Sequence, residues 1–508
     1  MGVMLGSAAA AVACLSVYAY RLNKVLASTP PEAGRYAMPR LAEEEARAVY
    51  EQVEREGRNG GYDRGDSDGH GCANPFRARI QAGMPTRRDR RYIVVGGSGL
   101  VGGEIVLALL GNGTPAEAIR IVDVREPMRD EFRRGSGAAS RVPVFLVDIS
   151  SERAVREAFE AEWPDEEALV SSTIPTSTVF HTAAVIRWGE RSNLFWDRIA
   201  RVNIAGTANV ISASRAAGAG ILIYTSSASV ENREVNWFPA PWRRYPTNFV
   251  QHIDGSAPGG FSTDEGGKKS DKPDDQYPTT YARTKAVAEK LVCEADDSPS
   301  GSSSGSRMRT GAIRPGNAIY GHIKDPVVGQ MLSLRWVPSF NAAWVQSWVS
   351  SANVALAHVQ LESAMLGEHV DSVAGRPFVV TDDGPPIICS DYYALLSATS
   401  RTGFEVTRPP PLLFLSMFYV IEAWAILSTR FPGTLGRLLG EPGPPIDVLQ
   451  PGTAAAAINS IIHDHEARMP VGQGGMGYRP VCTTVEGICA VVAQWNRFVD
   501  EGKDKDKE

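Results

Sequence analysis

The stretch "RRYIVVGGSGLVGGEIVLALLGNG", Arg90–Gly113, decides the fold of this chain. An apolar run leads into a glycine turn, and a second apolar run without proline follows it. Gly96, Gly99 and Gly102 have the spacing in which the first glycine permits a sharp turn, the second admits a pyrophosphate and the third lets helix and strand pack closely. The helix that follows would offer free N–H groups to phosphates. The pattern predicts a dinucleotide-binding βαβ unit, with a glycine turn that binds no ligand as the alternative.

Short β-rich runs recur on both sides of further helical stretches. They read "IRIVDV", "VPVFLVDI", "STVFHTAA", "GILIYTSS" and "RTGAIRPG". Strands that alternate with helices predict βαβ units and a parallel sheet. We therefore expect an α/β fold with a Rossmann-type doubly wound parallel sheet. Past Ile319 the alternation weakens, which indicates a smaller C-terminal substrate-binding region.

Changes in composition along the chain suggest five parts. We expect a membrane anchor at residues 1–28, a polar linker or cap at 29–88, an NAD(P)-binding Rossmann domain at 89–320, a C-terminal region at 321–500 that partly returns to the Rossmann domain, and a charged tail at 501–508. Two polar insertions, Asp254–Asp275 and Asp296–Ser306, have linker composition and predict surface loops.

Composition excludes several classes of protein. A hydrophobic content of 43% and a charged content of 22% are typical of a globular chain. The net charge of −6 argues against a nucleic-acid binder, which normally has a basic face. The six cysteines are scattered and form no CxxC pair, which favours reduced thiols and neither a disulfide framework nor a metal site.

Two apolar segments concern membranes. Gly2–Tyr20 carries no charge and is followed by Arg21 and Lys24, which favours a signal anchor with the body on the cytosolic side. A loosely attached or disordered N-terminus is the alternative. Pro411–Phe431 has Glu422 in its middle, so a buried or membrane-surface helix is favoured over a span. We expect the protein at the endoplasmic reticulum or another intracellular membrane.

An acidic residue stands about 20 positions after the glycine turn, as a ribose site requires. Asp123 ends "IRIVD", and its carboxylate would favour NAD over NADP, although Arg125 could soften that preference. Asp148 ends the next strand and would meet the adenine ring or form a surface turn. Ala183 follows the predicted fourth strand, where a small residue would leave room for the cofactor. His181 in the same run is expected to be a packed core residue rather than a catalyst.

The stretch "YARTK" places Tyr281 one helical turn before Lys285, on the same helical face. A free phenol has a pKa of about 10 and is a poor base at neutral pH. A nearby ammonium and the positive nicotinamide would both stabilise phenolate and bring its pKa toward the working range. Hydroxyls at the end of "LIYTSSASV" would bind the substrate oxygen. The pattern predicts proton removal from an alcohol whose hydride leaves to the nicotinamide.

The chain resembles an extended short-chain dehydrogenase/reductase. More narrowly, it resembles the 3β-hydroxysteroid dehydrogenase and sterol-4α-carboxylate 3-dehydrogenase (decarboxylating) family from about Arg91 to Phe498. The likeness rests on "VGGSGLVG", "IVDVREP", "VFHTAA", "VNIAGTANVI", "YTSSASV", "YARTKAVAEKLV", "AIRPGNAIYG" and "WVSSANVALAH", in the expected order. The later "GRPFVVTDDGPP" and "GYRPVCTTVEGI" resemble the family's C-terminal signatures.

The resemblance implies a catalytic triad of Ser227, Tyr281 and Lys285, with Ser226 as the alternative serine. It also makes Pro315 a cofactor neighbour, and we interpret Asn353 and His358 as structural. The predicted cofactor contacts are Gly96, Ser98, Gly99, Leu100, Val101, Gly102, Asp123, Asp148, Ala183, Tyr281, Lys285 and Pro315. Two departures from the family pattern occur in segments that would line the substrate site. They are the 54-position separation of serine from tyrosine and the stretch "HDHEARMPVGQGGMGY".

The function implied is NAD(P)-dependent oxidation of a 3β-hydroxyl on a steroid or sterol-like substrate, with decarboxylation to follow if carbon 4 carries a carboxyl group. A related reductase or epimerase acting on another secondary metabolite or a sugar nucleotide is the alternative enzyme. A cofactor-binding scaffold or sensor is the alternative that is not an enzyme. We expect a lipophilic small-molecule substrate, membrane attachment through the N-terminal segment and no nucleic acid, and a homodimer stays open.

Overall fold

The computed structural model describes residues 2–58, 75–133, 137–164, 177–255, 261–263, 269–271, 276–297 and 307–505. Its centre is a seven-stranded sheet with the order β14-β9-β5-β4-β1-β2-β3, in which every neighbouring pair is parallel. The strands are β1 (Arg91–Val95), β2 (Ile119–Asp123), β3 (Val144–Leu146), β4 (Ser177–His181), β5 (Ile221–Thr225), β9 (Arg309–Pro315) and β14 (Arg376–Val380). Helices cover both faces, so most inner strands are apolar runs rather than alternating ones. The doubly wound parallel sheet predicted from the sequence is confirmed.

The strand order reverses between β1 and β4. From β1 the chain moves outward to β2 and β3, then returns to β4 on the other side of β1, with Val95 opposite His181. In open α/β sheets, ligands bind outside the carboxyl ends of the strands at such a switch point. Because all strands are parallel, the residues that follow them meet at one edge.

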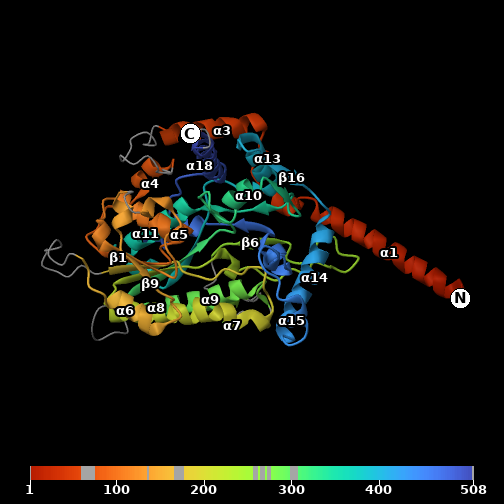
Figure 1. The fold of residues 1–508 in the computed structure, drawn as a ribbon, viewed down its shortest axis with the longest axis horizontal. Helices are drawn as coiled ribbons and strands as arrows, with labels where there is room; N and C mark the ends of the chain where they lie inside the picture. Colours follow the sequence, from red (N-terminus) through yellow and green to blue (C-terminus); the bar gives the residue numbers. More distant parts are fainter. Residues whose placement is uncertain are drawn as a thin grey trace.

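Helices lie on both faces of this sheet (Figure 1). α5 (Leu100–Gly111) and α11 (Ser351–Met365) pack together on one face, and α6 (Glu152–Glu160), α8 (Thr207–Ala216) and α9 (Thr280–Glu294) form the layer on the other. The chain approaches α8 through α7 (Trp196–Ala200) and a π-helical turn, Arg201–Gly206.

The chain returns to the large sheet after residue 320, because β14 pairs with β9. The remaining C-terminal strands build small sheets together with β6 and β10, which come earlier in the chain: β15-β12-β17-β6, β10-β13 and β11-β16. These strands are β6 (Val250–Ile253), β10 (Ile319–Tyr320), β11 (Trp336–Pro338), β12 (Val345–Gln346), β13 (Val349–Ser350), β15 (Ile387–Ile388), β16 (Glu405–Thr407) and β17 (Asn459–Ile462). Between and after them lie α10 (Val328–Leu334), α12 (Val370–Val373), α13 (Cys389–Thr399), α16 (Pro451–Ala456), α17 (His465–Arg468) and α18 (Thr484–Lys505).

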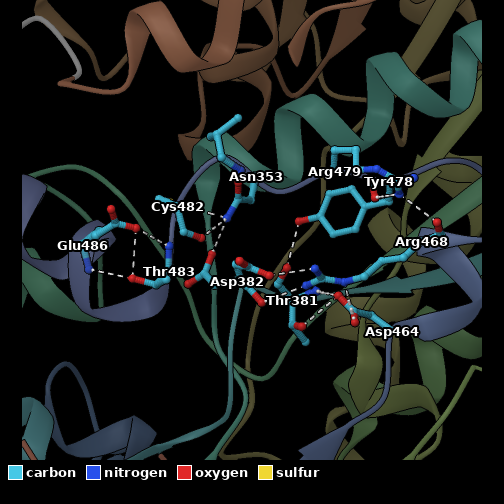
Figure 2. A network of polar contacts seen from close by, with 12 residues as sticks. Asn353, Thr381, Asp382, Asp464, Arg468, Tyr478, Arg479, Cys482, Thr483 and Glu486 are labelled. Atoms are coloured by element: carbon cyan, nitrogen blue, oxygen red, sulfur yellow. Dashed lines mark hydrogen bonds and ion pairs between the residues drawn. The ribbon is translucent and has the colours of Figure 1, made fainter. Parts of the chain in front are cut away.

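A buried carboxylate joins these C-terminal segments to the nucleotide domain (Figure 2). Asp382 accepts from the amide of Asn353 at 2.7 Å. It also accepts from the backbone N–H of Ser350 at 2.7 Å and from the hydroxyl of Tyr320 at 2.6 Å. Burial raises the pKa of Asp382 to about 6. The donors surrounding this buried carboxylate compensate for the loss of its water.

Residues 29–88, predicted to be a polar linker or a cap, are where described a packed layer of helices, so the cap alternative describes them. The layer contains α2 (Pro31–Gly34), α3 (Glu43–Gly57) and α4 (Arg77–Gly83), and α3 packs on α13 and α18. Val53, Phe76 and Ile80 are buried there. The segment is polar overall because only one stripe of each short helix faces the body.

The remaining predictions about boundaries have mixed outcomes. Of the insertion Asp254–Asp275, the structure describes beyond Gly255 only the hairpin β7 (Phe261–Thr263) and β8 (Lys269–Asp271); the insertion 296–306 lies outside the described residues after Asp297. The tail expected from residue 501 begins as helix, because α18 continues to Lys505. The five described cysteines are unpaired, and Cys72 lies outside the described residues.

Two helices lie at the edge of the body. α1 (Gly2–Leu26) projects away from the body. α14 (Pro411–Arg430) begins beside the end of α1 that packs on the body and runs toward α15 (Leu435–Leu439) (Figure 1). Within the described residues, α14 is the one helix whose length and composition would let it cross a membrane, and 33% of its most apolar 18-residue stretch is buried.

Candidate active site

The glycine turn lies at the switch point, between β1 and α5. Gly96 has φ +85°, a left-handed conformation that glycine adopts without strain. A Cβ on Gly96 would lie 2.5 Å from the backbone nitrogen of Ala183, and one on Gly102 would lie 2.3 Å from the Gly96 carbonyl oxygen. Gly99 begins the helix from extended backbone. The first and third glycines therefore have the structural roles that the sequence predicted.

The turn is also tied to the acidic residue of the ribose site. The backbone N–H of Ser98 donates to Asp123 Oδ2 at 3.0 Å, and that of Arg125 donates to Oδ1 at 3.3 Å. Burial raises the pKa of Asp123, while these N–H donors act in the opposite direction. The Ser98 hydroxyl is buried and has no hydrogen-bond partner in the described part of the chain. A glycine cradle with an unpaired hydroxyl beside a fixed carboxylate fits the phosphates and ribose of a dinucleotide.

The other predicted cofactor contacts lie along the same edge. Leu100 and Val101 open α5, Ala183 follows β4 against Gly96, and Pro315 is buried at the end of β9. Asp148 follows β3 and is exposed; its Oδ1 accepts from the backbone N–H of Ser150 at 2.9 Å. The surface-turn alternative therefore describes Asp148, and its contact with adenine stays a prediction.

The structure distinguishes the two candidate serines that follow β5. The Ser227 side chain lies close enough to the phenol of Tyr281 to lower its pKa, and its hydroxyl is 2.8 Å from the Ser229 hydroxyl. Ser226 is buried, and its hydroxyl has no partner among the described residues. The geometry thus brings Ser227, and not Ser226, to Tyr281.

Helix α9 presents Tyr281 and Lys285 from its first turns. Thr279 caps the helix by accepting from the backbone N–H of Ala282 at 3.0 Å. The ammonium of Lys285 donates to the Thr225 carbonyl at 2.7 Å and lies 4.6 Å from the centre of the Tyr224 ring. It is 6.0 Å from the Tyr281 ring centre. The predicted pair shares one helical face.

The charge balance of the pair differs from the prediction. Burial raises the pKa of Tyr281 to about 12, and only the neighbouring Ser227 side chain acts against that rise. Burial also lowers the pKa of Lys285 to about 7, against the pull of Glu289. The lysine was expected to lower the pKa of the phenol toward neutral pH. These residues alone do not do so, because desolvation dominates the pKa of both groups.

Sequence reasoning missed a clamp behind the pair. Asn203, in the π-helical turn, donates to the Val185 carbonyl and the Thr284 hydroxyl, each at 3.0 Å, and accepts from the Val185 N–H at 2.8 Å. It ties the segment after β4 to α9 one residue before Lys285. The motif "VNIAGTANVI" contained the residue, but a π turn, common at functional sites, interrupts the helical periodicity that could have placed it.

His181 is a core residue, as expected. Its Nε2 donates to the Thr207 hydroxyl at 2.9 Å, because that hydroxyl gives its own proton to the Asn203 carbonyl. Burial lowers the pKa of His181 to about 3, so the ring is neutral. The histidine supports the clamp through Thr207.

Asn353 and His358 are structural, in agreement with the interpretation from the sequence. Asn353 belongs to the Asp382 network (Figure 2). His358 donates from Nδ1 to the Val354 carbonyl and accepts at Nε2 from the Thr225 hydroxyl, both at 2.7 Å. It fixes the strand end that precedes Ser227.

The chain is similar to known proteins in sequence and in fold. The chain is similar to short-chain dehydrogenase/reductase family 42E member 1 of Danio rerio, with 23% identity over 427 residues, 83% of this chain and 92% of the relative. It is 25% identical to the decarboxylating sterol-4-alpha-carboxylate 3-dehydrogenase of Saccharomyces cerevisiae over 422 residues, 81% of this chain and 98% of the relative. The UDP-glucose-4-epimerase of Stenotrophomonas maltophila, solved with NAD, shares the fold, with TM-score 0.51, 16% identity and coverage of 81% and 99%.

A family profile covers the segments that build the site. The 3-beta hydroxysteroid dehydrogenase/isomerase family matches residues 93–236 and 262–408, more than half of the chain. These residues include the glycine turn, Asp123, the serine after β5 and the Tyr281–Lys285 helix. With its parallel sheet and this site at the switch point, the chain belongs to the 3-beta hydroxysteroid dehydrogenase/isomerase family.

Proposed function

We propose that the protein is an NAD-dependent oxidoreductase that oxidises a 3β-hydroxyl on a steroid or sterol-like substrate. The observation that carries the proposal is the meeting of Ser227, Tyr281 and Lys285 at the sheet edge that also holds the glycine turn. Membership in the 3-beta hydroxysteroid dehydrogenase/isomerase family supports the substrate class. Asp123 supports NAD over NADP, because a fixed carboxylate repels a 2′-phosphate.

The residues of the chain divide the work on the alcohol. Ser227 would donate to the substrate oxygen, and Tyr281 would take the hydroxyl proton. Lys285 is held by Thr225 and would orient the nicotinamide ribose and keep a positive charge near the phenol. Bound NAD+ supplies the hydride acceptor and a further positive charge. That charge matters here, because burial leaves the phenol with a pKa of about 12.

A carboxyl group at carbon 4 would need no additional catalytic residue. Oxidation at carbon 3 makes the substrate a β-keto acid, which loses CO2 because the ketone takes the electron pair as an enolate. The relative from Saccharomyces cerevisiae bears the name of such a decarboxylating enzyme. This finer assignment is part of the proposal.

A substrate panel tests the function directly. We would incubate the protein with NAD+ and a 3β-hydroxysterol, the same sterol carrying a 4-carboxyl group, or a UDP-sugar. NADH formation with either sterol supports the proposal, and CO2 release with the carboxylated one supports the decarboxylating form. Turnover of the UDP-sugar alone would overturn it in favour of an epimerase. Ser227→Ala should lower the sterol rate by about a hundredfold, whereas Ser226→Ala should preserve most of it.

A further inference from the structure

A row of alternating charges leads from Lys285 into the core behind the active site. Glu289 follows Lys285 by one turn of α9, so the two side chains share one helical face. Arg314 lies on β9 directly before Pro315. All three charged side chains are buried, and those of Glu289 and Arg314 are completely so. Because a buried charge is costly unless it is paired, the contacts of these residues decide what they do.

One guanidinium connects separate segments of the site. Arg314 donates from Nε to Glu289 Oε2 at 2.8 Å and from Nη2 to Glu289 Oε1 at 2.6 Å, which makes a bidentate pair. Its Nη1 donates to the carboxylate of Glu231. Glu231 ends the short turn that Ser227 caps at its beginning. Arg314 therefore ties α9 to the turn that carries Ser227.

The charge of Lys285 depends on a balance between burial and Glu289. Burial lowers the pKa of Lys285 to about 7, and the carboxylate of Glu289 acts against that fall. The other titratable groups that interact with Lys285 are neutral at pH 7, because burial lowers the pKa of the imidazoles and raises that of the phenols: His181 on β4, Tyr224 on β5, Tyr281 on α9 and His358 on α11. Within the part of the chain that the structure describes, Glu289 is thus the anion that favours the charged form of the lysine.

We propose that Arg314 is a positioning residue for the active site. It acts through Glu289, whose charge keeps Lys285 cationic in its buried place, and through Glu231, which fixes the turn that begins at Ser227. The Thr225 carbonyl holds the same ammonium but carries no net charge, so it cannot replace Glu289. The part of this role that concerns catalysis rests on the proposed function, whereas the coupling of Glu289 to Lys285 is measurable without a substrate.

The pH dependence of stability reports the charge of Lys285 directly. Urea unfolding from pH 5 to pH 10 is measured for the wild type, Lys285→Met, Glu289→Gln and the double variant. The quantity compared is the difference in the free energy of unfolding between the proteins with lysine and with methionine at position 285. Below the folded pKa of Lys285 both states bind its proton and the difference is constant. Above it only the unfolded chain does, so the difference rises with pH.

In the Glu289→Gln background this rise should begin about one pH unit lower than in the wild type, because the anion that favours the charged lysine is gone. Glu294→Gln is the matched control, since it removes a carboxylate from the exposed last residue of the same helix. It should leave the onset unchanged. If Glu289→Gln does not fold, Glu231→Gln removes the partly buried carboxylate instead and should shift the onset in the same direction by less. An unchanged onset in the folded variant would overturn the coupling.

Arg314→Lys separates the geometry from the charge. Lysine keeps the positive charge but cannot bind a carboxylate as a fork. The onset of the rise should stay close to that of the wild type, whereas kcat for a 3β-hydroxysterol should fall about tenfold with little change in KM. Full turnover would overturn the positioning role. A wild type that oxidises no sterol would refute the proposed function, and the unfolding series would still decide whether Glu289 acts on Lys285.

Discussion

The ammonium of Lys285 and the backbone carbonyl of Thr225 are joined by a 2.7 Å hydrogen bond. Thr225 ends β5, and its hydroxyl is held by His358 of α11. The bond therefore connects the helix that carries Tyr281 to the strand that leads into Ser227. A single buried lysine fixes the spacing between the two halves of the site.

Burial of Lys285 makes stability depend on pH. Its folded pKa of about 7 lies below the ordinary lysine value of about 10, so between these pH values the unfolded chain binds a proton that the folded chain does not. Between pH 7 and pH 10, the free energy of unfolding of the wild type should therefore increase relative to that of Lys285→Met, by roughly a few kcal/mol. Urea unfolding at pH 7 and 10 measures the difference. Parallel behaviour of the two proteins would contradict it.

Gly102 tests the close approach of helix and strand. A Cβ at Gly102 would meet the Gly96 carbonyl oxygen at 2.3 Å, so Gly102→Ala should displace the turn and weaken NAD+ binding by about tenfold or more, or ~1.4 kcal/mol. Gly111→Ala is the matched control, because the same helix there offers ordinary contact at 3.6 Å. Calorimetric titration with NAD+ compares them, and equal affinities would refute the assigned role.

Asp123 should set the choice between NAD and NADP. Asp123→Asn keeps an oxygen to accept the Ser98 N–H but removes the charge that would repel a 2′-phosphate. The ratio of NADP+ to NAD+ affinity should rise by about tenfold. Titration of both nucleotides measures the ratio. No change would mean that the carboxylate serves the glycine turn alone.

The Arg191–Glu422 pair should be strongly coupled in stability. Arg191→Met leaves a buried carboxylate without its bidentate partner and should cost about 3–5 kcal/mol. The double variant Arg191→Met/Glu422→Leu should recover much of that loss, because no uncompensated charge remains. Urea unfolding of the two single variants and the double variant forms the cycle. Additive losses would show that the pair does not hold α14 to the body.

Features carried by neighbouring residues could be predicted from the sequence. The glycine turn, the strand before it and Asp123 occupy one short βαβ unit, so period and turn chemistry reveal them together. Tyr281 and Lys285 are one helical turn apart, which places them on one face without knowledge of the fold. The choice between Ser226 and Ser227 needed the structure, because it depends on which hydroxyl leaves β5 toward α9.

Features that depend on distant partners could not be predicted. Glu422 lies 231 positions from Arg191, so the sequence did not show which residue pairs with this acidic side chain in an apolar helix. The helix Glu43–Gly57 is polar in composition. Its packing could not be predicted, because its partners α13 and α18 come more than 300 residues later. The raised pKa of Tyr281 follows from burial, which the local sequence does not show.

The proton transfer assigned to Tyr281 is the central claim, and Tyr281→Phe tests it most directly. The initial rate of NADH formation from a 3β-hydroxysterol is measured beside the dissociation constant for NAD+. If Tyr281 takes the proton, the rate of Tyr281→Phe should be about 10²–10⁴ times lower than that of the wild type with NAD+ binding unchanged, because the ring remains and only the phenol oxygen is lost. Wild-type turnover by Tyr281→Phe would contradict it.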